Sequence, residues 1–367
     1  MVTAVAPVGA NATRLWGLTA EERLRRIAVA QKLEVRPDGE LLVNLGYAFD
    51  PGWLKLAAAK PGLVVTRGGV PVLANVGADE AIRGAMEQNA PLPAPGEEPL
   101  PGETLAWEES RGLENEELRK KQRPFMDRLA PETVRGLERA SYFGAYKGVT
   151  DLLTKYLWPE WALVLTRWAA RIGMTPNQVT FVGASLCLLA TWLFYQGWYW
   201  TGLAAGLVFM VLDTVDGKLA RCTITSSKVG EAFDHGIDLV HPPFWWWAWG
   251  VGLHAWGRPL EPGLFWWTFA AIIAAYVVQR LIEGAFIARF GMHIHVWRRF
   301  DSRFRLITAR RNPNMVILLA FLVAGRPDWG LLAVAAWTLL SLAVHMVQLA
   351  QALAARAAGR PVVSWLA

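Results

Sequence analysis

The chain has 367 residues, of which 53% are hydrophobic and 19% are charged, and its formal net charge is +6. Residues 1–140 hold 18 Lys and Arg against 20 Asp and Glu, so the positive excess belongs to residues 141–367, where basic residues lie between long apolar runs. This pattern is typical of the cytoplasmic loops of a membrane protein. The absence of a basic-aromatic pattern argues against a nucleic-acid partner, and two cysteines, Cys187 and Cys222, exclude a disulfide framework.

Residues 1–88 alternate short β-like runs with helix-like runs, which predicts a small soluble α/β or α+β domain. The stretch ELLVNLGYAFD predicts a strand and a turn, and PGWLKLAAAK predicts a short helix that starts after Pro51. A hairpin across Gly68 and Gly69 is predicted for PGLVVTRGGVPVLANV. The N-terminus lacks a basic segment followed by an apolar one, so we expect no cleaved signal peptide.

Residues 89–140 are predicted to form a Pro-rich linker followed by charged helices. The stretch NEELRKKQRPFMDRL and the longer one that begins with PETVRGLERASYF both read as amphipathic helices. The next stretch, PEWALVLTRWAARIGM, is apolar on one side, which predicts a helix at the membrane surface before the first span. For its Arg167, and for Lys147, Asp151 and Lys155 before it, we expect a solvated face rather than a site.

Residues 141–367 are predicted to form an all-α bundle of six transmembrane helices, each about 20 residues long. Basic residues gather in the loops after the second and fourth helices, whereas the opposite loops offer only Arg258 and Arg326. The positive-inside rule then places both termini on the cytoplasmic side of the inner, or cytoplasmic, membrane. The predicted ranges are 177–197, 199–220, 229–253, 263–288, 312–325 with its flanks, and 328–353.

Four aspartates lie where the second predicted helix ends and the third begins. An aspartate at the centre of a membrane costs about 2.5–3.5 kcal/mol, so four of them need compensating cations. Hard divalent ions with oxygen ligands, Mg²⁺ or Mn²⁺, would supply that charge. Helical spacing places two sets on one face each, namely Asp213, Asp216, Gly217 and Ala220 on the second helix and Gly230, Asp234 and Asp238 on the third. Arg221 adds a cation suited to a phosphate.

These residues fill the pattern D-x2-D-G-x2-A-R-x8-G-x3-D-x3-D without a gap, and the chain resembles the CDP-alcohol phosphotransferases over about residues 145–355. The resemblance implies a membrane enzyme with six helices that displaces CMP from a CDP-alcohol by an acceptor hydroxyl. It implies that Asp213, Asp216 and Asp234 hold two divalent metal ions, Mg²⁺ or Mn²⁺, against the CDP diphosphate. Asp238 is implied to be the general base for the acceptor, with a share in metal binding.

The resemblance also implies which residues line the cytidine and phosphate pocket, namely Gly217, Ala220, Arg221 and Gly230. Asn177, in the stretch TPNQVT that opens the first span, is either a substrate contact or a helix-start residue. The active site is expected on the cytoplasmic side, and relatives resemble homodimers. Some relatives resemble fusions with a nucleotidyltransferase, but residues 1–88 lack its G-x-G-T-R-like loop, so that domain is either a decayed remnant or an unrelated regulatory one.

The substrate stays open at the level of the sequence. The favoured donor is CDP-diacylglycerol with an anionic acceptor, and the alternative is a CDP-linked polyol with a polyol or lipid hydroxyl as acceptor. Seven arginines from Arg289 to Arg311 either touch membrane lipids or bind a phosphorylated acceptor; the candidates are Arg299, Arg303, Arg310 and Arg311. Arg280 and Glu283 are expected to pair. The competing class is a membrane cation transporter that uses the aspartates as an ion site, although no repeat in two halves is evident.

Overall fold

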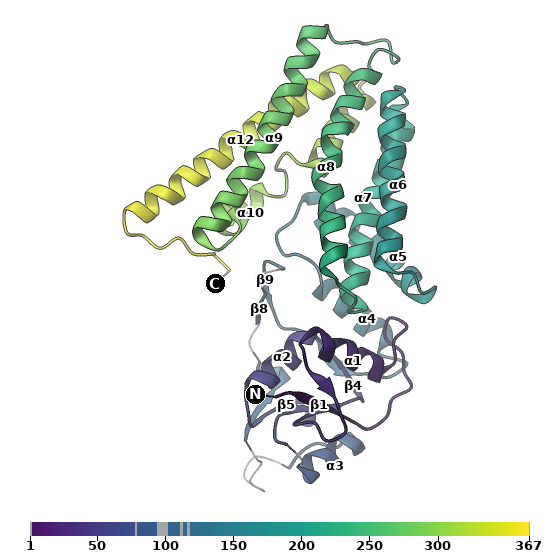
Figure 1. Ribbon diagram of the computed structural model, residues 1–367, viewed down its shortest axis with the longest axis vertical. Coiled ribbons are helices and arrows are strands. Elements are labelled where there is room, and N and C mark those ends of the chain that lie inside the picture. The colour runs from purple at the N-terminus through teal and green to yellow at the C-terminus, as the bar shows by residue number, and fades with distance from the viewer. Residues whose placement is uncertain (1, 78, 94–101, 111–112, 116–117, 367) are drawn as a thin grey trace.

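The computed structural model of the chain describes residues 2–77, 79–93, 102–110, 113–115 and 118–366. A unit built around a β-sheet, formed by the N-terminal part of the chain, lies at one end of a long bundle of helices (Figure 1). The chain is therefore mostly helical with an N-terminal α/β region, as the sequence predicts at this coarse level.

The N-terminal sheet has the strand order β2-β1-β3-β6-β5-β7. Strand β1 (Ala4–Val8) pairs in parallel with β2 (Glu34–Val35) and β3 (Leu41–Asn44), and the hairpin of β5 (Leu63–Arg67) and β6 (Val70–Ala74) joins β3 through an antiparallel pair. Three helices accompany the sheet: α1 (Ala20–Ala30), α2 (Pro51–Ala59) and α3 (Glu80–Gln88).

Several local predictions for this unit are confirmed. The strand of ELLVNLGYAFD becomes β3 followed by β4 (Tyr47–Phe49), and α2 covers PGWLKLAAA with Asp50 as its N-cap. The hairpin turn lies at Gly68 and Gly69, which have φ of 58° and 80°. Positive φ at both central residues is what a tight two-residue hairpin turn requires, and glycine adopts it without steric cost.

The segment from 103 to 128 differs from its prediction as linker and charged helix. Strand β7 (Glu103–Ala106) extends the sheet beside β5, and β10 (Met126–Arg128) pairs with β4. Between them, β8 (Leu113–Asn115) and β9 (Lys120–Gln122) form an antiparallel pair. The helix predicted for NEELRKKQRPFMDRL is therefore wrong: pairing with open strand edges outweighs local helix propensity. The sheet also extends beyond residue 88, where the sequence placed the domain boundary.

The long amphipathic helix predicted after residue 131 is shorter than expected. It forms α4 (Val134–Gly144) and ends there; a loop follows, then a short π-helical turn (Leu153–Leu157) and α5 (Pro159–Arg171). Trp161, Val164 and Trp168 lie exposed on α5 at helical spacing. The place of α5 at a membrane surface stays a prediction.

Helices lie at all six ranges predicted as spans. They are α6 (Pro176–Tyr195), α7 (Tyr199–Cys222), α8 (Lys228–Gly252), α9 (Pro262–Phe290), α11 (Arg311–Val323) and α12 (Pro327–Ala357), with α10 (Arg299–Phe304) before α11. Among the described residues, α6, α9 and α12 are long and apolar enough to cross a membrane. Helices α7 and α8 have the length but carry the aspartates, and α11 is short.

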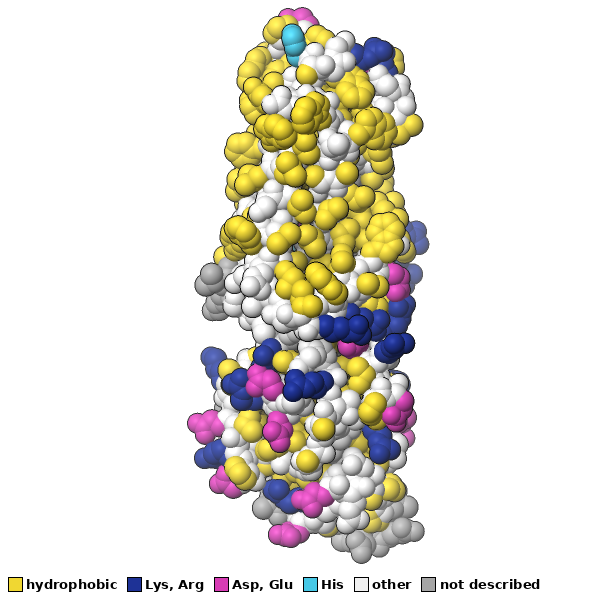
Figure 2. Space-filling view, turned by 90° about the vertical axis from the view of Figure 1, so that its right-hand side faces the viewer, with side chains coloured by type: hydrophobic (Ala, Val, Ile, Leu, Met, Phe, Trp, Pro, Cys, Tyr) yellow, Lys and Arg dark blue, Asp and Glu magenta, His cyan; other side chains and the backbone are white. Residues whose placement is uncertain are grey.

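The face of the helical part that Figure 2 shows is largely apolar. Hydrophobic side chains dominate the upper half of the face in Figure 2, whereas charged side chains gather at and below the level where the helices meet the N-terminal unit. Exposed tryptophans such as Trp192, Trp198, Trp266 and Trp267 belong to this helical part. An exposed apolar surface of this extent marks a membrane protein rather than a soluble monomer.

Helix α8 contains two consecutive prolines, Pro242 and Pro243. Proline has no N–H, so the carbonyls four residues earlier, at Asp238 and Leu239, lose their helical partners. The Leu239 carbonyl instead accepts a hydrogen bond of 3.1 Å from the Tyr276 hydroxyl of α9. This contact ties α8 to α9 one residue beyond Asp238.

The N-terminal unit is docked onto the helical part by polar contacts around the end of α7. Arg23 and Arg26 of α1 donate to the carbonyls of Cys222 and Thr223, at 3.2 and 2.8 Å. Cations at a helix C-terminus stabilise the last carbonyls and the dipole. The indole of Trp16 donates to Ser141 at 2.8 Å, and one buried apolar cluster includes Trp53 in the N-terminal unit and Trp158 before α5. The two parts therefore share a core.

Gly148 allows the β8–β9 arm to approach the helices. Its N–H donates to the carbonyl of Leu118 at 2.8 Å, and a Cβ at this position would lie 2.5 Å from the carbonyl oxygen of Arg119. We predict that Gly148→Ala lowers the free energy of unfolding by about 1–3 kcal/mol, because backbone must move to admit the methyl group. Thermal unfolding in detergent would measure the loss.

Gly136→Ala is the matched control for this prediction. Gly136 lies within α4 with nothing within 4 Å of its Cβ position, so alanine there should leave stability unchanged or raise it slightly. Equal melting of Gly148→Ala and the unmodified chain would contradict the close approach.

Candidate active site

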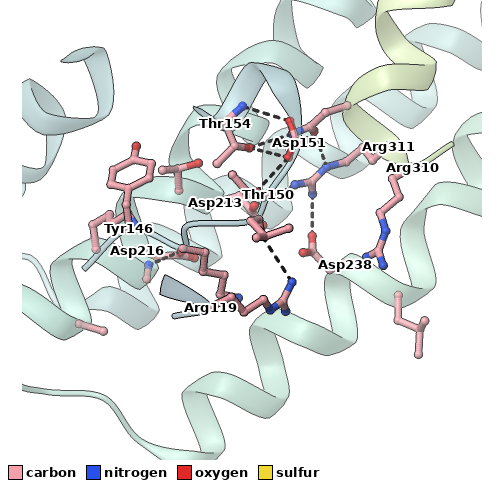
Figure 3. A pocket seen from close by; sticks show the side chains of 18 of the residues that line it. Arg119, Tyr146, Thr150, Asp151, Thr154, Asp213, Asp216, Asp238, Arg310 and Arg311 are labelled. Atoms are coloured by element: carbon pink, nitrogen blue, oxygen red, sulfur yellow. Dashed lines mark hydrogen bonds and ion pairs between the residues drawn. The ribbon is translucent and has the colours of Figure 1, made fainter. Parts of the chain in front are cut away.

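A cavity of about 880 Å³ opens where the helices meet the β8–β9 arm. Its walls come from α6, α7, α8, α9 and α11, from the segment 146–154 and from residue 119 of the arm (Figure 3). Most of the residues singled out from the sequence line it: Asn177, Asp213, Asp216, Gly217, Ala220, Arg221, Gly230, Asp238, Arg310 and Arg311. The described residues of the spacing pattern, which lie on α7 and α8, therefore share one space with Asn177 of α6 and with Arg310 and Arg311 at the start of α11.

Asp213 of α7 and Asp238 of α8 converge on the guanidinium of Arg311 at the start of α11. Arg311 contacts Asp213 at 2.8 Å through one terminal nitrogen and Asp238 at 2.6 Å through the other. The Arg311 side chain is only 11% exposed, whereas that of Asp238 is 43% exposed. Asp238 thus keeps an open side toward the cavity while one cation joins the two carboxylates.

Asp216 is held more deeply in the wall of the cavity. It is 3% exposed and accepts a hydrogen bond of 2.6 Å from the hydroxyl of Thr180. Thr180 is the last residue of TPNQVT, and the start of this stretch is fixed by a capping box between Thr175 and Gln178. The stretch that opens the first predicted span therefore orients a motif carboxylate as well as starting a helix.

The two motif glycines make room for polar side chains. A Cβ on Gly217 would lie 3.1 Å from a terminal nitrogen of Arg221, and a Cβ on Gly230 would lie 3.1 Å from the side-chain oxygen of Asn177. The Nε atom of Arg221 is buried and has no hydrogen-bond partner among the described residues. Arg221 is therefore available to an anion in the cavity, which suits the predicted phosphate role.

The side chain of Asp234 lies outside the described residues, although its position falls within α8. The described donor set for a metal ion is then Asp213, Asp216 and Asp238. Carboxylate oxygens are the ligands that Mg²⁺ and Mn²⁺ prefer. The chemistry of these three groups suits a divalent cation, while in this structure the charge of Arg311 lies between Asp213 and Asp238.

The arginines of the 289–311 segment divide into two groups. Arg310 and Arg311 line the cavity, and so does Arg305, which the sequence did not single out. Arg299 and Arg303 are exposed on α10, where Arg299 lies over the ring of Trp365 at 5.5 Å, and neither belongs to the cavity wall. The acceptor roles predicted for Arg299 and Arg303 are not retained.

Asp151 lines the cavity, in contrast to the solvated position expected for it. It is 7% exposed and accepts hydrogen bonds from Asn312 at 3.0 Å and from the Thr154 hydroxyl at 2.8 Å. Burial works to raise the pKa of Asp151, but the charge of Arg305 and these hydrogen bonds hold it below its ordinary value. Lys147 lines the cavity too, whereas Arg167 pairs with Glu138 at 2.7 Å outside it.

The predicted pair of Arg280 and Glu283 is confirmed at 3.1 Å. Glu283 also contacts Arg310 at 2.6 Å, His295 at 3.3 Å and His345 at 3.5 Å. Ligand atoms of Glu283 and the two histidines lie within 4.8 Å of one another, which is a metal-like spacing. Two guanidinium groups on the same carboxylate already supply its positive charge, so we assign this cluster to an ion-pair network.

Comparison with known proteins covers part of the helical region. Residues 173–324 match the family model described as CDP-alcohol phosphatidyltransferase, and the chain contains a domain of that family. This confirms the resemblance drawn from the aspartate pattern.

Three relatives illustrate the match. Cholinephosphotransferase 1 of Gallus gallus is 34% identical over 130 residues, which cover 32% of this chain and 36% of the relative. Cholinephosphotransferase 1 of Homo sapiens is 30% identical over 182 residues, covering 46% of this chain and 43% of the relative. An uncharacterized CDP-alcohol phosphatidyltransferase class-I family protein of Schizosaccharomyces pombe is 34% identical over 107 residues, covering 26% and 28%. The chain thus spans less than half the length of these relatives.

Among solved structures, the chain is similar to the crystal structure of Mycobacterium tuberculosis phosphatidylinositol phosphate synthase (PgsA1) with CDP-DAG bound. The TM-score is 0.41 at 16% identity, with 51% of this chain and 92% of that chain covered. The N-terminal unit, residues 2–128, lies outside the range of the family model.

Proposed function

We propose that the protein is a membrane phosphotransferase that displaces CMP from a CDP-linked alcohol by the hydroxyl of an acceptor alcohol, in phospholipid biosynthesis. The observation that carries the proposal is the convergence of Asp213, Asp216 and Asp238 with Gly217 and Arg221 on one cavity. The match of residues 173–324 to the family model supports it, and it makes the cation-transporter alternative the weaker one.

In the proposed reaction, the acceptor O–H gives its proton to the carboxylate of Asp238, whose side chain is open to the cavity. The acceptor oxygen forms a bond to the phosphorus that carries the donor alcohol, and the bond from that phosphorus to the oxygen of CMP breaks. Arg221 pairs with the phosphates, and Gly217 and Gly230 leave space beside them. Two divalent ions, Mg²⁺ or Mn²⁺, held by Asp213, Asp216 and Asp238, with Asp234 completing the predicted set, would neutralise the diphosphate.

For the donor we propose CDP-diacylglycerol, with an anionic acceptor. The alternative donor is a CDP-linked small alcohol with a lipid hydroxyl as acceptor, and the name cholinephosphotransferase carried by the curated relatives supports this direction. We further propose six membrane spans, α6 to α9, α11 and α12, with α5 at the surface and the cavity on the cytoplasmic side together with both termini. The basic loops after α7 and α9 support that orientation. The homodimer stays a prediction.

The test is metal-dependent CMP release by the purified full chain in lipid-containing detergent. Donors are CDP-diacylglycerol and CDP-linked small alcohols, each with glycerol 3-phosphate, inositol, inositol phosphate or diacylglycerol as acceptor. We expect CMP release that requires Mn²⁺ or Mg²⁺ and one acceptor, and that stops when EDTA removes the metal. A chain that binds neither metal nor CDP would contradict the proposal and favour the cation transporter.

A further inference from the structure

The wall of the cavity carries a second group of charges, which does not belong to the aspartate pattern. Arg280 comes from α9, Arg305 and Arg310 from the segment between α10 and α11, and Arg119 from the β8–β9 arm. Arg119 lies outside residues 173–324, so the N-terminal unit supplies part of this wall.

These guanidinium groups are buried with donors left over. Arg305 is 8% exposed, and its Nε and one terminal nitrogen have no hydrogen-bond partner among the described residues. The Nε atoms of Arg119, Arg280 and Arg310 are buried and without such a partner as well. Buried N–H groups that lack a hydrogen-bond partner cost free energy. A group of them around one space therefore indicates a binding place for a ligand that accepts hydrogen bonds.

The charges of this wall are not balanced by acids. Glu283 is shared between Arg280 and Arg310, and Asp151 is the carboxylate whose pKa the charge of Arg305 lowers. Burial lowers the pKa of Arg305 to about 9 and that of Arg119 to about 10, and the charge of Arg310 acts in the same direction on both. Burial and the charge of Arg119 lower the pKa of His293 to about 4. An anion between these groups would relieve their repulsion.

The position of Arg119 is fixed by its backbone. Its φ is 52°, a left-handed value that few residues other than glycine adopt, and the neighbouring Leu118 carbonyl is bound by the N–H of Gly148. On the other side, the Lys120 amine donates to the carbonyl of Phe143 at 3.2 Å. The arm therefore holds Arg119 against the cavity in a conformation that costs free energy, as is common at functional positions.

We propose that Arg119, Arg280, Arg305 and Arg310 form an anion subsite for a phosphate monoester, and that Arg119 makes the N-terminal unit a determinant of acceptor specificity. The inference rests on the proposed function, in which the acceptor hydroxyl enters the same cavity as the donor. The phosphate belongs either to a water-soluble phosphorylated alcohol or to an anionic lipid headgroup. In both cases the bidentate geometry of arginine suits the group.

The test is binding of inorganic phosphate to the full chain in phosphatidylcholine nanodiscs, without metal or CDP-linked donor, measured by thermophoresis. We expect the unmodified chain to bind phosphate and Arg119→Gln to bind it at least about tenfold more weakly, the effect of losing a hydrogen bond to a charged group. Arg119→Lys should recover part of the loss. Arg128→Gln, a change at an exposed arginine of β10 outside the cavity, is the matched control and should bind like the unmodified chain.

Two competition experiments distinguish whether the natural ligand is a soluble phosphorylated alcohol or an anionic lipid. Glycerol 3-phosphate added in solution should displace phosphate if the ligand is a soluble alcohol, and phosphatidic acid placed in the nanodisc should do so if it is a lipid. The subsite is overturned if Arg119→Gln binds phosphate as tightly as the unmodified chain, or if binding is lost in Asp213→Asn but kept in Arg119→Gln. Binding needs no turnover, so its loss and a lack of CMP release are separate results.

Discussion

Asparagine in place of Asp238 is expected to lower the rate of CMP release by at least about a hundredfold. A general base contributes about 10²- to 10⁴-fold to a proton-transfer step, and an amide cannot accept the proton of the acceptor hydroxyl. Among the motif carboxylates that the structure describes, Asp238 has the open side toward the cavity, since its side chain is 43% exposed. The rate should be measured at saturating donor and acceptor, so that weaker binding is not mistaken for slower chemistry.

Asp328→Asn provides the matched control for Asp238→Asn. Asp328 lies at the start of α12, pairs with Arg326 at 2.6 Å and does not line the cavity. Both variants lose one carboxylate from a helix of the bundle, but only one loses it from the candidate site. The base assignment fails if Asp238→Asn keeps more than about a tenth of the rate, or if Asp328→Asn loses as much.

Glutamine in place of Arg311 is expected to make folding depend on divalent metal. Arg311 is the cation that joins Asp213 and Asp238, and its removal leaves the largely buried carboxylate of Asp213 facing that of Asp238 without a cation between them. Breaking a buried ion pair by removing one partner costs about 3–5 kcal/mol. In EDTA we therefore expect Arg311→Gln to unfold at least about 5 °C below the unmodified chain. Saturating Mn²⁺ should restore most of the difference, because the ion replaces the lost charge.

Arg303→Gln serves as the control for Arg311→Gln. Arg303 belongs to the same basic segment but is exposed on α10, so its loss should change the unfolding temperature by less than about 1 °C with or without metal. A Mn²⁺ effect of equal size in the unmodified chain and in Arg311→Gln would show that the metal does not bind at the two aspartates.

The sequence predicted the candidate site best where the chemistry requires side chains at a fixed spacing along a helix. Helical periodicity alone placed Asp213 and Asp216 on one face of α7 and Asp238 on a face of α8, and the structure brings these residues to one cavity with Arg221. Helix positions were predictable for a related reason: apolar runs of fixed length and N-terminal signals such as Thr175-Pro176 are local properties of the chain.

The rest depended on contacts between distant segments. The sequence around Arg119 gives no sign that this residue lines the cavity. Its position follows from the pairing of β10 with β4 and from the close approach at Gly148, which are contacts between distant segments. The partner of Asp151, Asn312, is far away in the sequence, and burial of that pair could not be read from a charged local stretch. The role of Arg311 as partner of both aspartates was missed for the same reason. The position of Arg311 at the start of α11, next to Asn312, was the feature of the sequence that could have indicated this role.

The two prolines of α8 divide that helix into halves that differ in how firmly they are held. The half after the prolines is held by Trp245 and Trp249, which are fully buried and donate to the carbonyls of Cys187 and Pro327. The half before the prolines carries Asp238. Two backbone hydrogen bonds are missing between the halves, and the hydroxyl of Tyr276 binds the carbonyl of Leu239 there. Prolines are the usual origin of helix bending. The place where α8 is least held by its own backbone hydrogen bonds therefore lies directly beside Asp238, next to the candidate site.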